Sequence, residues 1–126
     1  MMKEKEKIIA NYIEGYNRFN IDQMVSDFDE HIRFENIENG ETTMTLTGLD
    51  SFKAQAEKAA ACFSTRIQTV NSYVHRDNET EAEIGYHATL AIDLPNGLKQ
   101  GEELRLKGRS IFRFAGNKIL ELTDIS

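Results

Sequence analysis

The spacing of apolar residues changes once along this chain, close to residue 64, and that change limits what the chain can fold into. Before it, three stretches repeat apolar residues every three or four positions, as one buried helix face does: 3–19, 20–28 and 50–63. After it, four runs alternate apolar and polar residues, as strands do: 66–76, 79–94, 103–114 and 118–125. A short hairpin formed by 31–37 and 42–47, with a turn at Asn39-Gly40, is predicted between the second and third helices.

Two of the alternating runs, 79–94 and 103–114, are unusually long. Strands usually span about 5–6 residues, and longer ones fit into a small domain only when the sheet is strongly twisted or bulged. We therefore expect an α+β fold, in which three helices of the N-terminal half pack on the concave face of a strongly curved, mainly antiparallel sheet. Such a cone has an internal pocket. The 126 residues, 40% of them hydrophobic, suffice for one domain spanning 1–126.

Polar residues support the expected helix boundaries. Asn20 is expected to cap the second helix, with Gln23 in the capping-box position and an apolar stripe that extends to Phe28. Asp50 is expected to cap the third helix, whose apolar face extends to Phe63.

Alternation in the last three runs separates an inner row of residues from an outer one. The even-numbered residues of 82–94, 104–114 and 120–124 are mostly apolar, whereas the odd-numbered ones are mostly charged or polar. A shift of one residue turns every side chain to the other face, so the even rows share the core only if paired residue numbers add to an even value. A two-residue turn at Asn96-Gly97 or at Gly116-Asn117 would give an odd value, so a longer loop or a bulge is predicted at both.

The nearest even registers bring three polar side chains together on the inner face. Ser110 would lie opposite Asp124, Phe112 opposite Leu122, and Tyr86 opposite Ser110. A carboxylate in an apolar row is costly unless it is paired or functional, which makes Asp124 the most informative residue of the chain. Two interpretations stay open: Asp124 lines a pocket, or it is a carboxylate near the C-terminal end that bonds to backbone or solvent.

The outer row of the sheet carries bands of opposite charge. Glu81 and Glu83 face a basic row on the next strand, formed by Arg105, Lys107, Arg109 and Arg113. Cross-strand ion pairing explains these bands. The apolar Ile111 and Ile125 on the same side favour a second interpretation, in which this face binds a partner.

Charge and hydropathy disfavour two classes of partner. A net charge of −6 and a pI near 5.1 lack the positive field on which nucleic-acid binding depends. No apolar run approaches the roughly 20 residues that span a bilayer, so membrane insertion is not expected. The charged segment 1–7 lacks the apolar core of a signal peptide, and a cytoplasmic location is therefore expected.

Metal and cofactor motifs are absent from the sequence. The three histidines, His31, His75 and His87, have no metal-ligand spacing, and no phosphate-binding loop, dinucleotide pattern or paired cysteine motif occurs. Cys62 is expected to be a small buried thiol. Neither a metal nor a cofactor is expected.

Several segments resemble the SnoaL-like branch of the nuclear transport factor 2-like superfamily, also called cystatin-like α+β cones. They are 16–22, 32–36, 47–50, and 112–114 followed by 116–119. The resemblance covers essentially the whole chain and implies the cone fold. It also implies homodimers that pack their sheets through the outer face. It leaves function open, because the superfamily includes ketosteroid isomerases, polyketide cyclases, dehydratases and non-catalytic binding domains.

The layout is similar to that of the ketosteroid isomerases, whose site can be placed on this sequence. The phenol that donates to the substrate oxygen falls on Tyr12, the general base on Asn36 and the second oxyanion donor on Ser110. An amide cannot remove a carbon-bound proton, so steroid isomerisation in that form is not expected. What remains is a pocket with donors at Tyr12 and Ser110, an amide at Asn36 and, from the strand register, a carboxylate at Asp124 on the neighbouring strand.

Two functions of different kinds follow. In the first, Asp124 is a general acid or base and Tyr12 polarises a carbonyl, in a cofactor-independent isomerase, cyclase or hydratase that acts on a small apolar molecule. The residues expected to contact that molecule are Asn36, Ser110, Tyr16, Tyr86, Phe34, Phe112 and Leu122. In the second, the chain is a non-catalytic ligand-binding or dimerisation module, or an accessory subunit, whose aromatic side chains fill the pocket.

Overall fold

The computed structural model describes residues 2–126; Met1, the first residue of the charged opening segment, lies outside them. Three helices are present: α1 (Met2–Asn17), α2 (Ile21–Val25) and α3 (Leu49–Ala60). They alternate in part with six strands: β1 (Phe28–Glu38), β2 (Glu41–Thr47), β3 (Phe63–Arg76), β4 (Glu79–Leu90), β5 (Glu103–Ala115) and β6 (Lys118–Ile125). The predicted α+β class and the order of its elements are confirmed.

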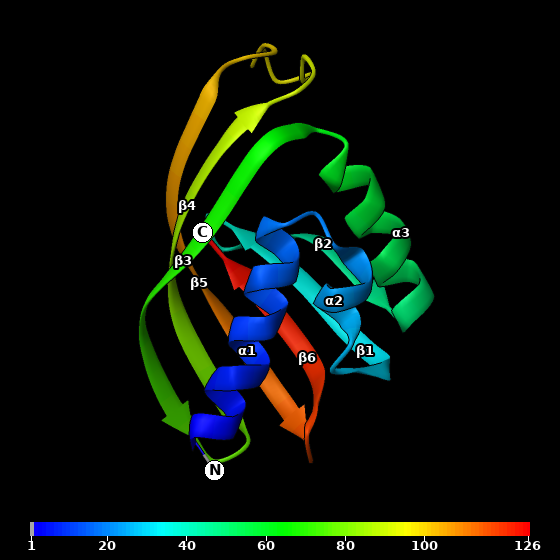
Figure 1. The fold of residues 1–126 in the computed structure, drawn as a ribbon, viewed down its shortest axis with the longest axis vertical. Coiled ribbons are helices and arrows are strands. Elements are labelled where there is room, and N and C mark those ends of the chain that lie inside the picture. Colours follow the sequence, from blue (N-terminus) through cyan, green and yellow to red (C-terminus); the bar gives the residue numbers. More distant parts are fainter. Residues whose placement is uncertain (1) are drawn as a thin grey trace.

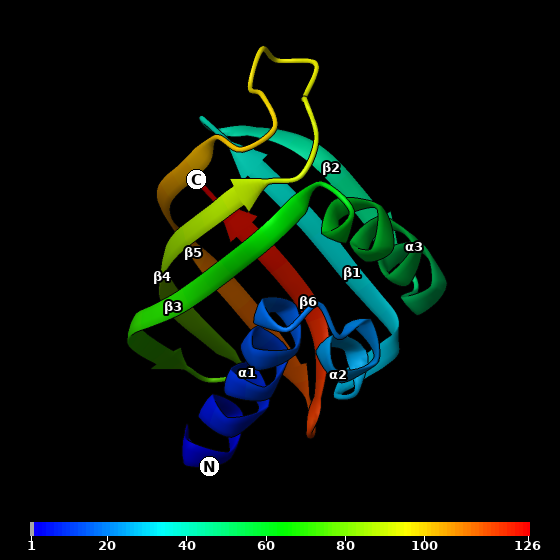
Figure 2. The same cartoon turned by 45° about the horizontal axis from the view of Figure 1, so that its top comes forward.

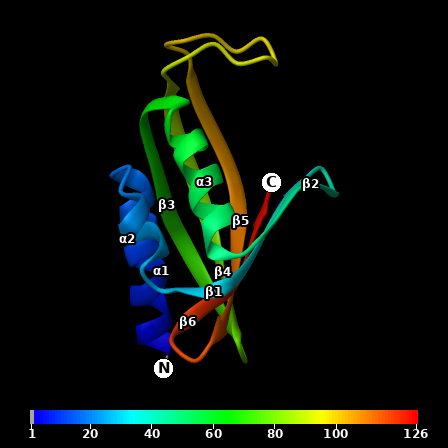
Figure 3. The same cartoon turned by 90° about the vertical axis from the view of Figure 1, so that its right-hand side faces the viewer.

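The strands form a single sheet with the order β2-β1-β6-β5-β4-β3 (Figure 1). Only β1 and β6 run parallel; the other neighbours are antiparallel, so the sheet is mainly antiparallel as expected. All three helices lie on one side of the sheet, and turning the molecule shows that the sheet curls toward them (Figures 2 and 3). The result is a cone of α+β type.

Bulges account for the length and curvature of the strands. The register shifts opposite Asn36/Ile37 of β1, where β2 has the extra residue Thr43, in β3 at Val70/Ser72, and opposite Arg113/Phe114 of β5, where β6 has the extra residue Leu120. The last of these lies beside the β5–β6 turn, where a bulge was expected. Each extra residue bends its strand and increases the local twist, which lets strands of this length wrap a small core.

The β5–β6 register is confirmed, with Ser110 opposite Asp124 and Phe112 opposite Leu122. The β4–β5 loop is long, as expected, but it spans residues 91–102, so β4 ends at Leu90 rather than at residue 94. Tyr86 therefore pairs with Leu106, and the expected pairing of Tyr86 with Ser110 is wrong. Residues after Leu90 belong to this loop instead of β4, and the loop folds on itself, with Leu94 N donating to Leu98 O.

The helix ends differ from the expectation at several positions. Asn20 caps α2 as predicted, with its side chain accepting from Gln23 N at 3.0 Å. However, α1 ends at Asn17, because Phe19 adopts a left-handed conformation with φ of 57° and turns the chain toward α2. Gly48 precedes α3 instead of Asp50, which lies in the first turn of the helix.

Two aromatic residues also belong to strands rather than to helices. Phe28 is the first residue of β1, and Phe63 is the first residue of β3. Both helices stop short of these residues, because α2 is a five-residue helix and α3 ends at Ala60.

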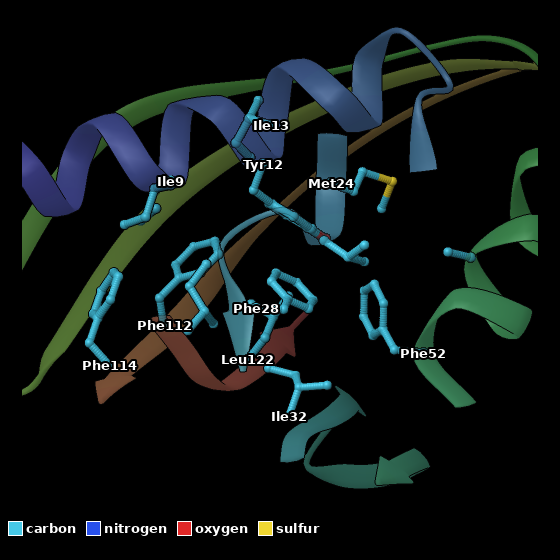
Figure 4. Close-up of a cluster of buried hydrophobic side chains, with 14 of the residues drawn as sticks. Ile9, Tyr12, Ile13, Met24, Phe28, Ile32, Phe52, Phe112, Phe114 and Leu122 are labelled. Carbon is cyan, nitrogen blue, oxygen red and sulfur yellow. The ribbon is translucent and has the colours of Figure 1, made fainter. Parts of the chain in front are cut away.

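The core fills the space between the helices and strands β1, β5 and β6 (Figure 4). Tyr12 on α1 stacks on Phe28 with ring centroids 5.6 Å apart and meets the edge of Phe112 at 5.7 Å. Phe52 on α3 contacts Phe28 at 4.9 Å. These ring contacts pack α1 and α3 against β1 and β5 of the sheet.

None of the helices in residues 2–126 has the length and apolar character needed to cross a lipid bilayer.

Candidate functional site

A cavity of about 190 Å³ lies inside the cone. Its walls are mainly apolar, and they come from α1, α2, α3 and strands β1, β2, β3 and β6. The lining residues are Tyr12, Tyr16, Met24, Phe34, Asn36, Met44, Leu46, Phe52, Gln55, Ala56, Ala59, Arg66 and Asp124. An apolar cavity with a few convergent polar groups is the usual form of a small-molecule site.

A more open groove of about 460 Å³ adjoins this cavity. Both share Tyr16, Asn36, Ala59 and Asp124, and the groove is lined in addition by Gln68, Tyr86, Leu106 and Ser110, among others. A ligand larger than the inner cavity could extend into the groove past Asp124. The Asp124 carboxyl therefore lies at the junction between the two spaces.

Asp124 is on β6, two residues from the end of the chain, with its side chain on the inner face of the sheet. The Ser110 hydroxyl donates a hydrogen bond of 2.6 Å to Asp124 Oδ1. Burial raises the pKa of Asp124 from 3.8 to about 6, and the Ser110 hydrogen bond counteracts part of that rise because it stabilises the charged form. Asp124 lines the cavity, which agrees with the first of the two interpretations of this residue.

Tyr12 lines the same cavity from α1. Its pKa is raised well above the ordinary value, first by burial and then by the negative charge of Asp124. The hydroxyl forms no hydrogen bond with any residue in the described range 2–126, and it is not fully buried. Tyr12 is therefore a neutral donor that is available to a ligand.

Tyr16 and Tyr86 form a pair at the boundary between cavity and groove. The Tyr16 hydroxyl donates to the Tyr86 hydroxyl at 2.9 Å. Burial raises the pKa of both phenols, so both stay protonated near neutral pH. Tyr16 lines the cavity, whereas Tyr86 lines only the groove.

The remaining expected site residues divide between cavity and core. Phe34 and Asn36 on β1 line the cavity; Asn36 lies beside Asp124 in the register and donates its amide to Thr43 Oγ1 at 2.9 Å. Phe112 and Leu122 are fully buried in the hydrophobic core and are not among the residues that line either space.

Arg66 is a cavity residue that the sequence did not reveal. It lies on β3 with an exposed fraction of only 2%, and it lines the cavity. Its Nε donates to the carbonyl oxygen of Tyr16 at 2.8 Å, and the guanidinium lies 3.8 Å from the centre of the Tyr16 ring. It pairs with Ala88, an inward residue of β4, and this register places its side chain on the inner face of the sheet.

The histidines and the cysteine show no metal-binding arrangement in the described part of the chain. No group of three His, Cys, Asp or Glu side chains there could hold a metal ion. His87 lies 2.8 Å from Glu103, and His75 lies 2.7 Å from Glu6. Cys62 is half-buried rather than buried, with its Sγ near Lys58 O at 3.6 Å.

A curved sheet with helices on its concave side and a pocket between them defines an α+β cone. The family model of the SnoaL-like domain matches residues 9–122. The chain belongs to the SnoaL-like domain family, as the resemblance of its sequence segments implied.

Solved structures share this fold at low sequence identity. A candidate polyketide cyclase from Xanthomonas campestris pv. campestris is 16% identical with a TM-score of 0.83, over 98% of this chain and 90% of its own. AclR, a candidate hydroxylase from Streptomyces galilaeus, is 14% identical with a TM-score of 0.79, over 98% and 89%.

A third structure has a ligand bound. It is a hypothetical protein with a ketosteroid isomerase-like fold from Catenulispora acidiphila in complex with trimethylamine, 13% identical with a TM-score of 0.75, over 93% of this chain and 82% of its own. A search of curated protein sequences finds no match.

Proposed function

We propose that this chain binds a small, mainly apolar, carbonyl-bearing molecule in the cone and transfers a proton within it, using Asp124 as the acid or base. The outcome is an isomerisation, a cyclisation or, where a water molecule adds to the substrate, a hydration, and none of these uses a cofactor. The observation that supports this most is the position of Asp124, which lines both the cavity and the groove and accepts a hydrogen bond from Ser110.

The ionisation of Asp124 suits this role. A pKa of about 6 means that both the protonated and the ionised form are populated near neutral pH. A general acid or base works best when its pKa lies near the working pH. As a carboxylate, Asp124 would remove a proton from the carbon next to the substrate carbonyl and then return it to another atom of the same molecule.

Tyr12 supplies the complementary group. Its hydroxyl is neutral, faces the cavity and has no described hydrogen-bond partner. When Asp124 takes the proton, negative charge develops on the substrate oxygen, and a donor already in place stabilises that charge without reorganisation. The apolar walls around Tyr12 strengthen the effect, because they lower the local dielectric.

The comparisons support a small-molecule ligand. Two of the similar structures are described as candidate enzymes, a polyketide cyclase and a hydroxylase, and a third holds trimethylamine. These identities are too low to transfer a substrate. They support the inference that the fold itself suits a small molecule in its pocket.

The test uses a small ketone whose acidic protons can be followed. The exchange of the α-protons of 2-indanone in D2O is measured by proton NMR with the wild-type chain, with Asp124→Asn and with buffer alone. We expect the wild type to accelerate exchange and Asp124→Asn to lose that acceleration by about 10²- to 10⁴-fold.

Glu121→Gln is the matched control for this test. Glu121 is on the same strand, but its side chain pairs with Arg113 on the outer face, so exchange should stay at the wild-type rate. Equal rates for the wild type and Asp124→Asn would remove the proposed proton transfer. Binding of 2-indanone without exchange would favour the non-catalytic module.

We also propose a homodimer that forms through the outer face of the sheet. This face carries the exposed apolar side chains Ile67 and Val74, while Ile111 and Ile125 on it are half-buried. Glu81 and Arg109 form a cross-strand ion pair there at 3.5 Å. Apolar residues among charges of both signs favour a self-complementary contact. The cytoplasmic location stays a prediction.

A further inference from the structure

Arg66 places a permanent positive charge inside the cone. A guanidinium does not lose its proton in a protein, so this side chain, which is 98% buried, carries its charge into a mainly apolar cavity. Burial of a charge is costly unless the charge is paired and its hydrogen bonds are satisfied. The partners of Arg66 therefore decide whether the group is purely structural.

The guanidinium of Arg66 has hydrogen-bond partners at Nε and Nη2, and two aromatic rings lie over it. Nε donates to Tyr16 O in the last turn of α1, an oxygen that also accepts from Phe19 N at 3.2 Å and lies at the partially negative end of the helix. Nη2 reaches Met24 Sδ at 3.9 Å, and a thioether is a weak acceptor. The rings of Tyr16 and Phe19 lie over the group at 3.8 Å and 4.5 Å.

No negative charge balances Arg66 within the described range. Among residues 2–126, no carboxylate forms an ion pair with it, and Nη1 has no hydrogen-bond partner there. Nη1 is not fully buried either, and the cavity is the space that Arg66 lines. Asp124 lines the same cavity, but its charge is stabilised by Ser110 rather than by Arg66.

We infer that the ligand of this cavity is a small apolar acid, whose carboxylate binds Arg66 through Nη1. This inference rests on the proposed function for the identity of the site, and it adds the class of molecule that the site selects. The apolar body of the acid lies against Phe34, Phe52 and Leu46, and its reacting carbonyl lies toward Tyr12 and Asp124. A carboxylate adds the attraction of opposite charges in an apolar cavity to the charge-assisted hydrogen bond that any acceptor forms with Arg66, so the carboxylate determines selectivity.

The test compares two molecules of one shape. Isothermal titration calorimetry at pH 7 measures the Kd of cinnamate, an aromatic carboxylate, and of cinnamamide, its uncharged isostere. We expect the wild type to bind cinnamate about tenfold or more tightly than cinnamamide. In Arg66→Met the ratio of the two Kd values should fall to about one.

Two further variants keep the test decisive. Arg18→Met removes the same charge from an exposed position on the chain after α1 and should keep the wild-type ratio. Arg66→Lys retains the charge and the contact with Tyr16 O but loses the forked donors, so the ratio should fall between the wild type and Arg66→Met. If Arg66→Met does not fold, the wild type and Arg66→Lys still decide the outcome.

Equal affinities in the wild type, no measurable binding of cinnamate, or a ratio that survives in Arg66→Met would overturn the inference. Its failure is distinct from failure of the proposed function. Asp124→Asn should keep the preference for cinnamate while it loses the exchange of 2-indanone protons. If Asp124→Asn keeps both the preference for cinnamate and the exchange of 2-indanone protons, the proposed proton transfer by Asp124 is refuted and the acid-binding role of Arg66 stands.

Discussion

The Ser110 hydroxyl and the Asp124 carboxylate meet across β5 and β6, with Oγ donating to Oδ1 at 2.6 Å. The two residues are directly opposite in the register, on the inner face of the sheet. Burial favours the protonated carboxyl, while this hydrogen bond favours the charged one. The balance between the two effects sets the pH at which Asp124 can act.

Ser110→Ala should therefore raise the pKa of Asp124 above 6. The variant removes the donor that stabilises the carboxylate and leaves the burial in place. The pH profile of 2-indanone exchange, followed by NMR, should shift its midpoint to higher pH. Ser72→Ala removes an exposed serine hydroxyl on β3 and should leave the profile unchanged. A shift to lower pH in Ser110→Ala would show that the hydroxyl does not stabilise the charged form.

Asp124 should make the folded state less stable as the pH rises. A carboxyl whose pKa is about 6 when folded and 3.8 when unfolded binds its proton more tightly in the folded state. Its contribution to stability is thus complete below about pH 3.8 and is lost as the pH rises toward 6. Asn keeps an acceptor for Ser110 and carries no charge. Asp124→Asn should therefore be more stable than the wild type at pH 7.5, by on the order of 1–3 kcal/mol.

Urea unfolding at pH 4 and pH 7.5 measures this difference. The gain in free energy of unfolding of Asp124→Asn over the wild type should be small at pH 4 and large at pH 7.5. Other titrating groups are common to both proteins and cancel in the comparison. The same gain at both pH values would mean that Asp124 does not titrate between them.

The sequence predicted the fold and part of the site because alternation marks the inner face of long strands. Asp124 stood out as a carboxylate among apolar inward residues, and the β5–β6 register followed from the parity of their rows. The same reasoning gave the wrong partner for Tyr86, because parity requires that paired residue numbers add to an even value but does not select which even value. The length of the 91–102 loop made that selection, and its internal hydrogen bonds are not visible in the spacing of residues.

Arg66 was missed for a related reason. The tight turn between β3 and β4 pairs Arg76 with Glu79, and continuing that register along β3 would place Arg66 on the outer face. The bulge at Val70/Ser72 shifts the register by one residue and turns Arg66 inward. No residue type in that stretch announces the bulge. Without that shift in register, the sequence predicts that Arg66 is an ordinary surface arginine.

Gly15 should not tolerate a side chain. A Cβ at this position of α1 would lie 2.6 Å from Met24 N and 3.0 Å from Gln23 C, both backbone atoms of α2. Gly15→Ala should reduce the free energy of unfolding by about 1–3 kcal/mol, measured in urea. Gly85→Ala is the matched control, since its Cβ would meet only Asn71 Nδ2 at 3.6 Å. Equal stability of Gly15→Ala and the wild type would contradict the close approach of α1 and α2.

Val74→Lys should weaken the proposed dimer. Val74 is an apolar residue on the outer face of β3 with 46% of its surface exposed, and a charge there would oppose burial against a second copy. Sedimentation velocity should show a dimer for the wild type and a shift toward monomer for the variant. Ile92→Lys changes a residue that is 44% exposed in the β4–β5 loop and should leave the dimer intact. A wild-type monomer would refute the interface.

The most direct test of the proposed proton transfer is the titration of Asp124 itself. Carbon-13 NMR of the side-chain carboxyl, assigned by the loss of its signal in Asp124→Asn, gives the pKa of this one residue. We expect a midpoint of about 6, which would identify a buried carboxyl able to exchange a proton at neutral pH. A midpoint close to 3.8, the ordinary value of an aspartate, would show that Asp124 is solvated and would contradict its role as the proton-transfer group.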